Sequence, residues 1–274
     1  MSNKYKPVGR CIYCGDINSQ LTDEHIIPYG LNGTLVLPKS SCLDCNKITS
    51  RIENNVLRGQ LRDVRAALNF KTRRPKERPK TFRLGIVRFG VEKQREVPYE
   101  DHVIYFPMPI FGLPGFITRQ PDKALKMHSV QTIYLGDRER VLQKYKAESI
   151  SHLMRIDAFD FARMIAKIAY CYLVAEKGID YLNKPNILSL IHGDGTHAGT
   201  WVGSSNEIVT ADSAEFCLRY ETYIDFSTGE PQGYALVYVK LFANISSPIY
   251  LVLVGPLSSE ATKGIHTIDT KVIN

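Results

Sequence analysis

The chain has 274 residues, of which 44% are hydrophobic, 10% aromatic and 23% charged. This composition excludes wholesale disorder and fibrous or low-complexity proteins, and the length suffices for one large domain or two modest ones. The best apolar run is only of strand length, and the basic N-terminus precedes no apolar core. We therefore expect neither a membrane-spanning helix nor a secretory signal, and we expect a cytoplasmic protein.

The net charge of +7 is distributed unevenly along the sequence. Residues 1–90 contain 17 Lys and Arg against 7 Asp and Glu, whereas residues 91–274 contain 18 against 21. The excess at the front of the chain predicts either contact with a polyanion or simply a solvated basic surface.

Four of the six cysteines lie in two C-x-x-C pairs, Cys11/Cys14 and Cys42/Cys45. Two residues between ligands allow a tight turn to direct both sulfurs at one ion. Two such pairs in a chain without an export signal favour a structural Zn²⁺ over a disulfide framework or a redox motif. The 27 residues between the pairs exceed the gap of an ordinary zinc ribbon, which predicts an insertion.

Residues 1–70 are expected to form one zinc-stabilised module, because few apolar residues lie between the cysteine pairs. Apolar residues at three-to-four-residue spacing predict a helix over residues 46–70, which Gly59 weakens locally. Residues 71–84 contain seven basic residues and two prolines. They predict an extended basic linker, which either lies along a phosphate backbone or serves only as a soluble tether.

The remainder, residues 85–274, is expected to be a mixed α+β domain, so that the whole chain is α+β. Short alternating runs predict strands, and an apolar stripe capped by Asp157 predicts a long helix. The expected elements are strands between residues 85 and 135, a helix over 156–177, and strands again from 185, ending in a hairpin of 234–245 and 249–254.

Two further groups of residues in this domain receive structural interpretations. Cys171 and Cys217 lie among apolar neighbours and are expected to be buried thiols. The segment His192-Gly193-Asp194-Gly195-Thr196-His197 contains metal-ligand residue types, but its two glycines favour a turn between strands.

A candidate catalytic group lies between the cysteine pairs and just after them. Glu24 and His25 fall between the pairs, and Asn46 follows the second pair directly. A zinc ion that joins the pairs would draw these three residues close together. Carboxylate and amide oxygens suit Mg²⁺ or Mn²⁺, and a neutral imidazole facing that ion can deprotonate water while the ion stabilises charge on a phosphate.

At these residues, from Cys11 to about Glu53, the sequence resembles the HNH endonuclease family, the zinc-containing subgroup of the ββα-metal nucleases. The resemblance is carried by Cys11-x-x-Cys14, Asp23-Glu24-His25-Ile26-Ile27-Pro28 with Gly30 and Gly33, and Cys42-x-x-Cys45-Asn46-Lys47.

The resemblance implies a role for each matched residue. The four cysteines would hold the structural zinc, His25 would be the general base, and Glu24 and Asn46 would bind the catalytic ion. The middle Asn of the family motif is absent from residues 35–41, and Asn32 is the nearest substitute. The group that orients His25 is therefore left open.

The implied activity is metal-dependent hydrolysis of DNA, as in restriction, phage-defence or mobile-element nucleases. Two alternatives stay open: a non-catalytic zinc-containing nucleic-acid-binding protein, and an HNH nuclease that acts on RNA. One such site cuts one strand, so a double-strand cut requires a homodimer or two events. Residues 85–274 are expected to recognise the target, to bind a regulatory protein partner or to sense a ligand. Basic residues expected to neutralise phosphates are Lys47, Arg51, Arg58, Arg62, Arg73 and Arg74.

Overall fold

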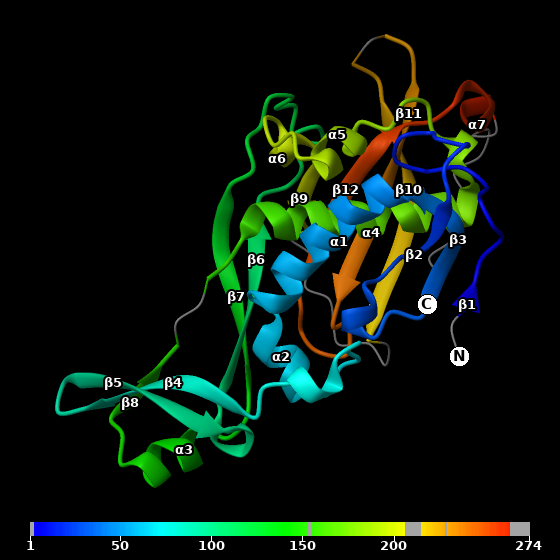
Figure 1. Ribbon diagram of the computed structural model, residues 1–274. Helices are drawn as coiled ribbons and strands as arrows, with labels where there is room; N and C mark the ends of the chain where they lie inside the picture. Colours follow the sequence, from blue (N-terminus) through cyan, green and yellow to red (C-terminus); the bar gives the residue numbers. More distant parts are fainter. Residues whose placement is uncertain (1–2, 153–154, 206–214, 228, 264–274) are drawn as a thin grey trace.

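The computed structural model describes residues 3–152, 155–205, 215–227 and 229–263. In these residues the chain has a mixed α+β fold, which confirms the expected fold class (Figure 1). None of the helices in these ranges combines the length and the hydropathy that crossing a membrane requires.

The N-terminal part begins with two antiparallel strands followed by a helix. Strands β2 (Leu21–His25) and β3 (Leu35–Cys42) pair so that His25 lies opposite Val36, and β1 (Asn3–Lys4) adds to β3 in parallel. A short 3-10 turn, η1 (Tyr29–Leu31), lies between β2 and β3. Helix α1 (Leu43–Arg58) follows β3 without a loop, which places the end of β2 beside the helix.

The helix predicted over residues 46–70 is two helices in the structure. Helix α1 ends at Arg58, and α2 (Arg62–Ala67) follows after a break at Gly59. The break lies at the residue with the lowest helix propensity in the segment, and the N–H of Gly59 closes α1 by donating to the carbonyl of Asn55 at 2.9 Å.

The basic segment after α2 is held against the N-terminal part. The N–H of Lys71 donates to Oδ1 of Asn32 at 2.9 Å, and Arg78 donates through Nη2 to the carbonyl of Phe70 at 2.5 Å. A 3-10 turn, η2 (Pro75–Glu77), lies between these two anchors. The segment is therefore a packed connection at its front end, whereas a free tether was one of the two interpretations of the sequence.

A small lobe follows, at the lower left of Figure 1. Strands β4 (Thr81–Arg88), β5 (Val91–Pro98) and β8 (Ser149–Ser151) form its sheet in the order β5-β4-β8, and α3 (Arg138–Tyr145) packs on it. The turn η3 (Tyr99–Asp101) leads into a two-stranded ribbon, β6 (Ile104–Phe111) and β7 (Met127–Leu135). This lobe has its own apolar core, formed by Leu84, Ile86, Val97, Val103, Val141 and Ile150.

The C-terminal half is built on one antiparallel sheet and one long helix. The sheet has the order β10-β11-β12-β9, and β11 (Gln232–Leu241) and β12 (Ile249–Pro256) confirm the predicted hairpin. The other two strands are β9 (Val202–Ser204) and β10 (Phe216–Asp225). Helix α4 (Ala158–Lys177) begins as predicted, with Oδ1 of Asp157 accepting from the N–H of Asp160 at 2.9 Å.

Shorter elements complete this half. They are η4 (Ile179–Tyr181), α5 (Ile187–His192), α6 (Ala198–Trp201) and α7 (Ser259–Lys263). The segment His192–His197 connects α5 to α6. The predicted turn is therefore present, but it lies between two helices and not between two strands. Asp194 accepts from both the N–H and the hydroxyl of Thr196, which closes that turn on itself.

One hydrophobic core extends through the N-terminal part and the C-terminal half. Helix α1 packs against α4, and Ile52, Val56, Phe161 and Ile165 belong to the same buried cluster. Alternate residues of β12, among them Val252, face that cluster, whereas their neighbours face a second cluster on the far side of the sheet. The division into residues 1–70 and 85–274 stays a prediction about folding units, but the two parts share a core.

The two isolated cysteines differ in the structure. Cys171 is buried on α4, as predicted, and burial raises the pKa of its thiol to about 12. Cys217 is exposed on β10, so the prediction of a buried thiol was wrong there. An apolar sequence neighbourhood does not decide which face of an edge strand a residue occupies.

Candidate functional site

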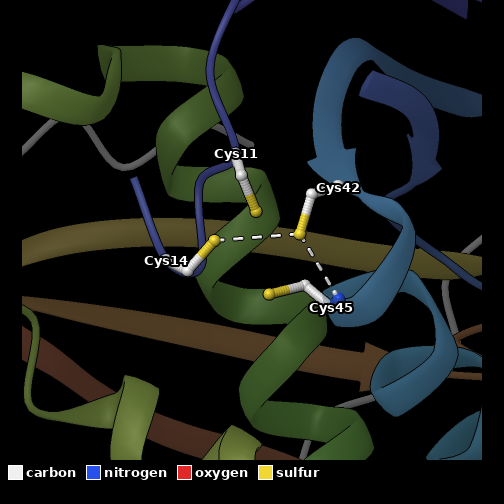
Figure 2. A group of neighbouring side chains, drawn as sticks. All are labelled: Cys11, Cys14, Cys42 and Cys45. Carbon is white, nitrogen blue, oxygen red and sulfur yellow. Dashed lines mark hydrogen bonds between the residues drawn. The ribbon is translucent and has the colours of Figure 1, made fainter. Parts of the chain in front are cut away.

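The four cysteines of the two C-x-x-C pairs come together in the structure. Their sulfur atoms all lie within 4.8 Å of one another and point toward a common centre (Figure 2). Cys11 and Cys14 lie in a turn before β2, where Gly15 has a φ of +80° and donates its N–H to the carbonyl of Cys11 at 2.8 Å. Four sulfur ligands can hold a metal such as zinc, as the spacing predicted.

The N-terminus of α1 favours the thiolate form of Cys42, in the second cysteine pair. Cys42 is the N-cap of α1, and its Sγ accepts from the N–H of Cys45 at 3.5 Å. Burial opposes ionisation, but this hydrogen bond and those from the other thiols hold the pKa of Cys42 below its ordinary value. A thiolate at the positive end of a helix is the form that binds a metal.

Helix α4 anchors the first pair from the C-terminal half. The hydroxyl of Tyr170 donates to the carbonyl of Ile12 at 2.5 Å, and the hydroxyl of Tyr13 lies 3.1 Å from Sγ of Cys171. The cysteine turn is therefore fixed from two sides, by β3 and by α4. The β3 contact is the hydrogen bond from the N–H of Ile12 to the carbonyl of Ser40 at 2.8 Å.

His25, the predicted general base, ends β2 and is half-buried. Its ring packs edge-on against Tyr29 at 5.7 Å between centroids, and its Nδ1 is buried with no hydrogen-bond partner in the described residues. Burial, followed by the nearby ammonium of Lys167, lowers the pKa of His25 below its ordinary value. The imidazole is therefore neutral at pH 7, the form that accepts a proton.

Glu24 lies beside His25 but turns inward, against α4. Its Oε1 is 2.8 Å from Nζ of Lys167, which is also 2.8 Å from Oε1 of Glu53 on α1 and donates to the backbone carbonyl of His25. Only 5% of Glu24 and 1% of Lys167 are exposed. Burial alone would lower the pKa of Lys167, but the two carboxylates outweigh it and raise that pKa, so the ammonium is charged.

The second oxygen of Glu24 has no such partner. Its Oε2 is buried and forms no hydrogen bond within the described part of the chain. A buried carboxylate oxygen without a donor is costly, so this atom is suited to a further cation or donor.

Asn46 lies in the first turn of α1, beside β2. Its Nδ2 donates to Oγ1 of Thr22 at 3.4 Å, and its Oδ1 accepts from the hydroxyl of Ser50 at 3.3 Å. Among the described residues, the four cysteines are the one group of three or more His, Cys, Asp or Glu whose ligand atoms converge within 4.8 Å. Glu24, His25 and Asn46 are thus gathered on neighbouring elements without forming a closed three-ligand cluster.

Asn32, the substitute considered for the missing middle Asn, forms its side-chain hydrogen bonds with other segments of the chain and not with the His25 imidazole. It has a left-handed backbone at φ +64° after η1, and its side chain bonds to Lys71 and Glu215. The contacts that hold His25 are instead the Tyr29 ring and the Lys167 hydrogen bond to its carbonyl.

A basic groove of about 690 Å³ opens beside this group. It runs along α1, α2 and the segment 71–79, and both Tyr29 and Glu53 line it. His25 itself does not line the groove, but Tyr29, whose ring contacts the His25 ring, does. Its basic lining residues are Arg58, Arg62, Arg65, Lys71, Arg73, Arg74 and Arg78.

The basic residues of the groove fall into two classes. The guanidinium groups of Arg65 and Arg78 donate to backbone carbonyls and fix the walls, and Arg74 pairs with Glu77 at 3.2 Å. Within the described residues Arg58 and Arg62 make no hydrogen bond or ion pair through their side chains, and neither does Arg73. These free cations are available to an anionic ligand.

Four of the six predicted nucleic-acid-binding residues, Arg58, Arg62, Arg73 and Arg74, line the groove. Lys47 and Arg51 are exposed on α1 outside its lining, and Lys47 pairs with Asp44 at 2.8 Å.

Sequence reasoning missed Lys167 and Glu53. The signal for Lys167 was present, since a single Lys interrupts the apolar stripe Met164-Ile165-Ala166-Lys167-Ile168-Ala169. A lysine at such a position is kept only where a buried acid meets it.

Comparison of the chain with protein-family models, with curated proteins and with solved structures finds no significant match. The function is therefore inferred from the geometry of the site.

Proposed function

We propose that this protein is a metal-dependent endonuclease that hydrolyses phosphodiester bonds of DNA, with His25 as the general base. The observation that carries the proposal is a neutral, half-buried histidine at the end of β2, in a ββα arrangement beside four converging cysteines. Its ring contacts Tyr29, which lines a groove that contains unpaired arginines.

The groove suits a nucleic-acid backbone. Arg58, Arg62 and Arg73 would neutralise phosphates, since each carries a guanidinium that makes no hydrogen bond or ion pair within the described residues. The contacts are directed at phosphate rather than at bases, so we expect weak sequence selectivity from this part of the protein.

Glu24 and Asn46 would hold a catalytic Mg²⁺ or Mn²⁺. In support, the buried Oε2 of Glu24 lacks a hydrogen-bond partner within the described residues, and Asn46 carries an amide oxygen on the neighbouring helix. Such an ion would stabilise negative charge on the phosphate. In the proposed step, the neutral imidazole of His25 takes a proton from the attacking water while the groove arginines hold the backbone in line. The water oxygen bonds to phosphorus as the bond from phosphorus to the leaving sugar oxygen breaks, and that oxygen takes up a proton from solvent water.

The test is cleavage of supercoiled plasmid by purified protein with Mn²⁺ or Mg²⁺. Wild type should nick or linearise the plasmid, whereas His25→Ala and an EDTA control should not. His128→Ala, at an exposed histidine outside the site, is the matched control and should cut like wild type. Full activity of His25→Ala would refute the mechanism.

One observation favours a second candidate, a zinc-containing protein that binds nucleic acid without cutting it. Lys167 already neutralises one oxygen of Glu24, the expected metal ligand. Binding of DNA without cleavage of duplex DNA, single-stranded DNA or RNA would support this candidate, and cleavage of RNA alone would identify RNA as the substrate.

A further inference from the structure

We propose that Glu24 and Glu53 form a buried cation site which Lys167 occupies, and that the Lys167 ammonium sets the affinity of the catalytic centre for divalent ions. The inference deepens the proposed function, since Glu24 is the carboxylate expected to hold the catalytic ion.

The geometry is that of a cation between two acids. Nζ of Lys167 lies 2.8 Å from one carboxylate oxygen of Glu24 and 2.8 Å from one of Glu53, and its third contact is the backbone carbonyl of His25. All three partners are oxygen atoms, as in the ligand sets of hard divalent cations. The ammonium therefore takes a position that an ion could fill.

The cation site has one carboxylate oxygen that the ammonium does not contact. Oε2 of Glu24 is buried and unpartnered within the described residues, so one carboxylate joins the lysine through Oε1 and still offers a second oxygen. A divalent ion held at Oε2 would lie near the ammonium and be repelled by it, because the surroundings are largely shielded from water.

With both acids ionised, two carboxylates and one ammonium sum to −1; burial raises the pKa of Glu53, and the Lys167 ammonium opposes that rise. Removing the ammonium gives −2 and removing one carboxylate gives 0, whereas removing both restores −1. If the ammonium sets the affinity through its charge, the affinity for divalent ions should increase as the net charge of the group becomes more negative. It should not depend only on whether a lysine is present.

The lysine comes from a different part of the chain than the acids. Lys167 lies on α4, whereas Glu24 lies on β2 and Glu53 on α1; these elements are labelled in Figure 1. Through this contact the C-terminal half acts directly on the candidate catalytic group. Lys167 is thus a positioning residue that works through Glu24, not a group that touches the substrate.

The experiment is a titration of the zinc-loaded full chain with Mn²⁺, with free Mn²⁺ measured by electron paramagnetic resonance. Thiolates prefer zinc, so Mn²⁺ should report on oxygen ligands only. The variants are Lys167→Leu, Glu53→Gln and the two combined. Lys177→Leu, at the exposed end of the same helix, is the matched control.

Lys167→Leu should bind one Mn²⁺ at least about tenfold more tightly than wild type, and Glu53→Gln should bind it more weakly by a similar factor. The double variant and Lys177→Leu should stay near wild type. A Lys167→Leu protein that keeps its zinc but binds Mn²⁺ no more tightly would overturn the proposal, and so would unchanged affinity in Glu53→Gln.

Two buried carboxylates without a lysine can prevent Lys167→Leu from folding, which zinc content and circular dichroism report. The Mn²⁺ affinities of Glu53→Gln and of the double variant then test the proposal, because these variants avoid the charge of −2. The net charge of the group is 0 in Glu53→Gln and −1 in the double variant. Cleavage is not part of this titration. A protein that cuts no nucleic acid would overturn the proposed function and leave the cation site testable.

Discussion

Replacing Cys42 by Ser should remove the metal and open the turn that contains Cys11 and Cys14. Ile12 and Tyr13, which lie in that turn, are 2% and 4% exposed. Transferring two such side chains to water costs about 3–6 kcal/mol in total. For a chain of this size each kcal/mol lowers the melting temperature by roughly 2–4 °C. We therefore expect a decrease of roughly 6–24 °C, accompanied by loss of the metal.

The assay pairs metal analysis by mass spectrometry with calorimetric unfolding. Wild type should contain one zinc per chain, and Cys42→Ser should contain almost none. Cys217→Ser, at the exposed cysteine of β10, should retain both the zinc and the melting temperature. A Cys42→Ser protein that melts within about 2 °C of wild type would refute the reasoning, because a metal that holds two buried side chains in place cannot be lost at so little cost. Wild type without zinc would refute it as well.

Three further predictions concern the groove, the small lobe and the loop after β2. Arg62→Ala should weaken DNA binding and lower the slope of log affinity against log salt by about 1, whereas Arg74→Ala, whose guanidinium is paired with Glu77, should change both less. Burial lowers the pKa of His152 to about 3. The unfolded chain therefore takes up a proton that the folded chain refuses, and stability should decline as the pH falls from about 6.5, by about 1–2 kcal/mol at pH 5. His152→Phe should abolish that part of the slope in urea titrations. Gly33→Ala would place a Cβ 1.9 Å from the carbonyl oxygen of Ile27, so it should destabilise the protein by about 1–3 kcal/mol, and wild-type stability would show that the loop relaxes freely.

The parts of the site that are close in sequence were predictable. Two residues between cysteines, and a helix that starts at the second pair, brought the four sulfurs together. The apolar period and the cap at Asp157 likewise predicted α4 to within two residues at its start and at its C-terminal residue. Such patterns report local geometry, which the backbone alone imposes.

Contacts between distant segments were not predictable in the same way. His25 and Lys167 are 142 positions apart, and no local pattern pairs a lysine with a particular acid. The packing of segment 71–79 against α2 depends on Arg65 donating to the carbonyl of Lys71 and Arg78 donating to the carbonyl of Phe70, which composition does not reveal. The sequence therefore indicated the four-cysteine cluster but not the residue that neutralises Glu24 and Glu53.

The contact between Lys167 and Glu53 has a consequence for the order in which the protein is made. Glu24, His25 and Glu53 leave the ribosome early, whereas Lys167 follows 114 positions after Glu53. At about 5–20 residues per second, Glu53 waits roughly 6–23 seconds for its partner, and Glu24 waits longer. Until then Glu24 and Glu53 have no ammonium between them, and the carbonyl of His25 lacks its hydrogen bond from α4. A chain interrupted during translation before α4 would thus carry these two acidic side chains without the cation that pairs with them.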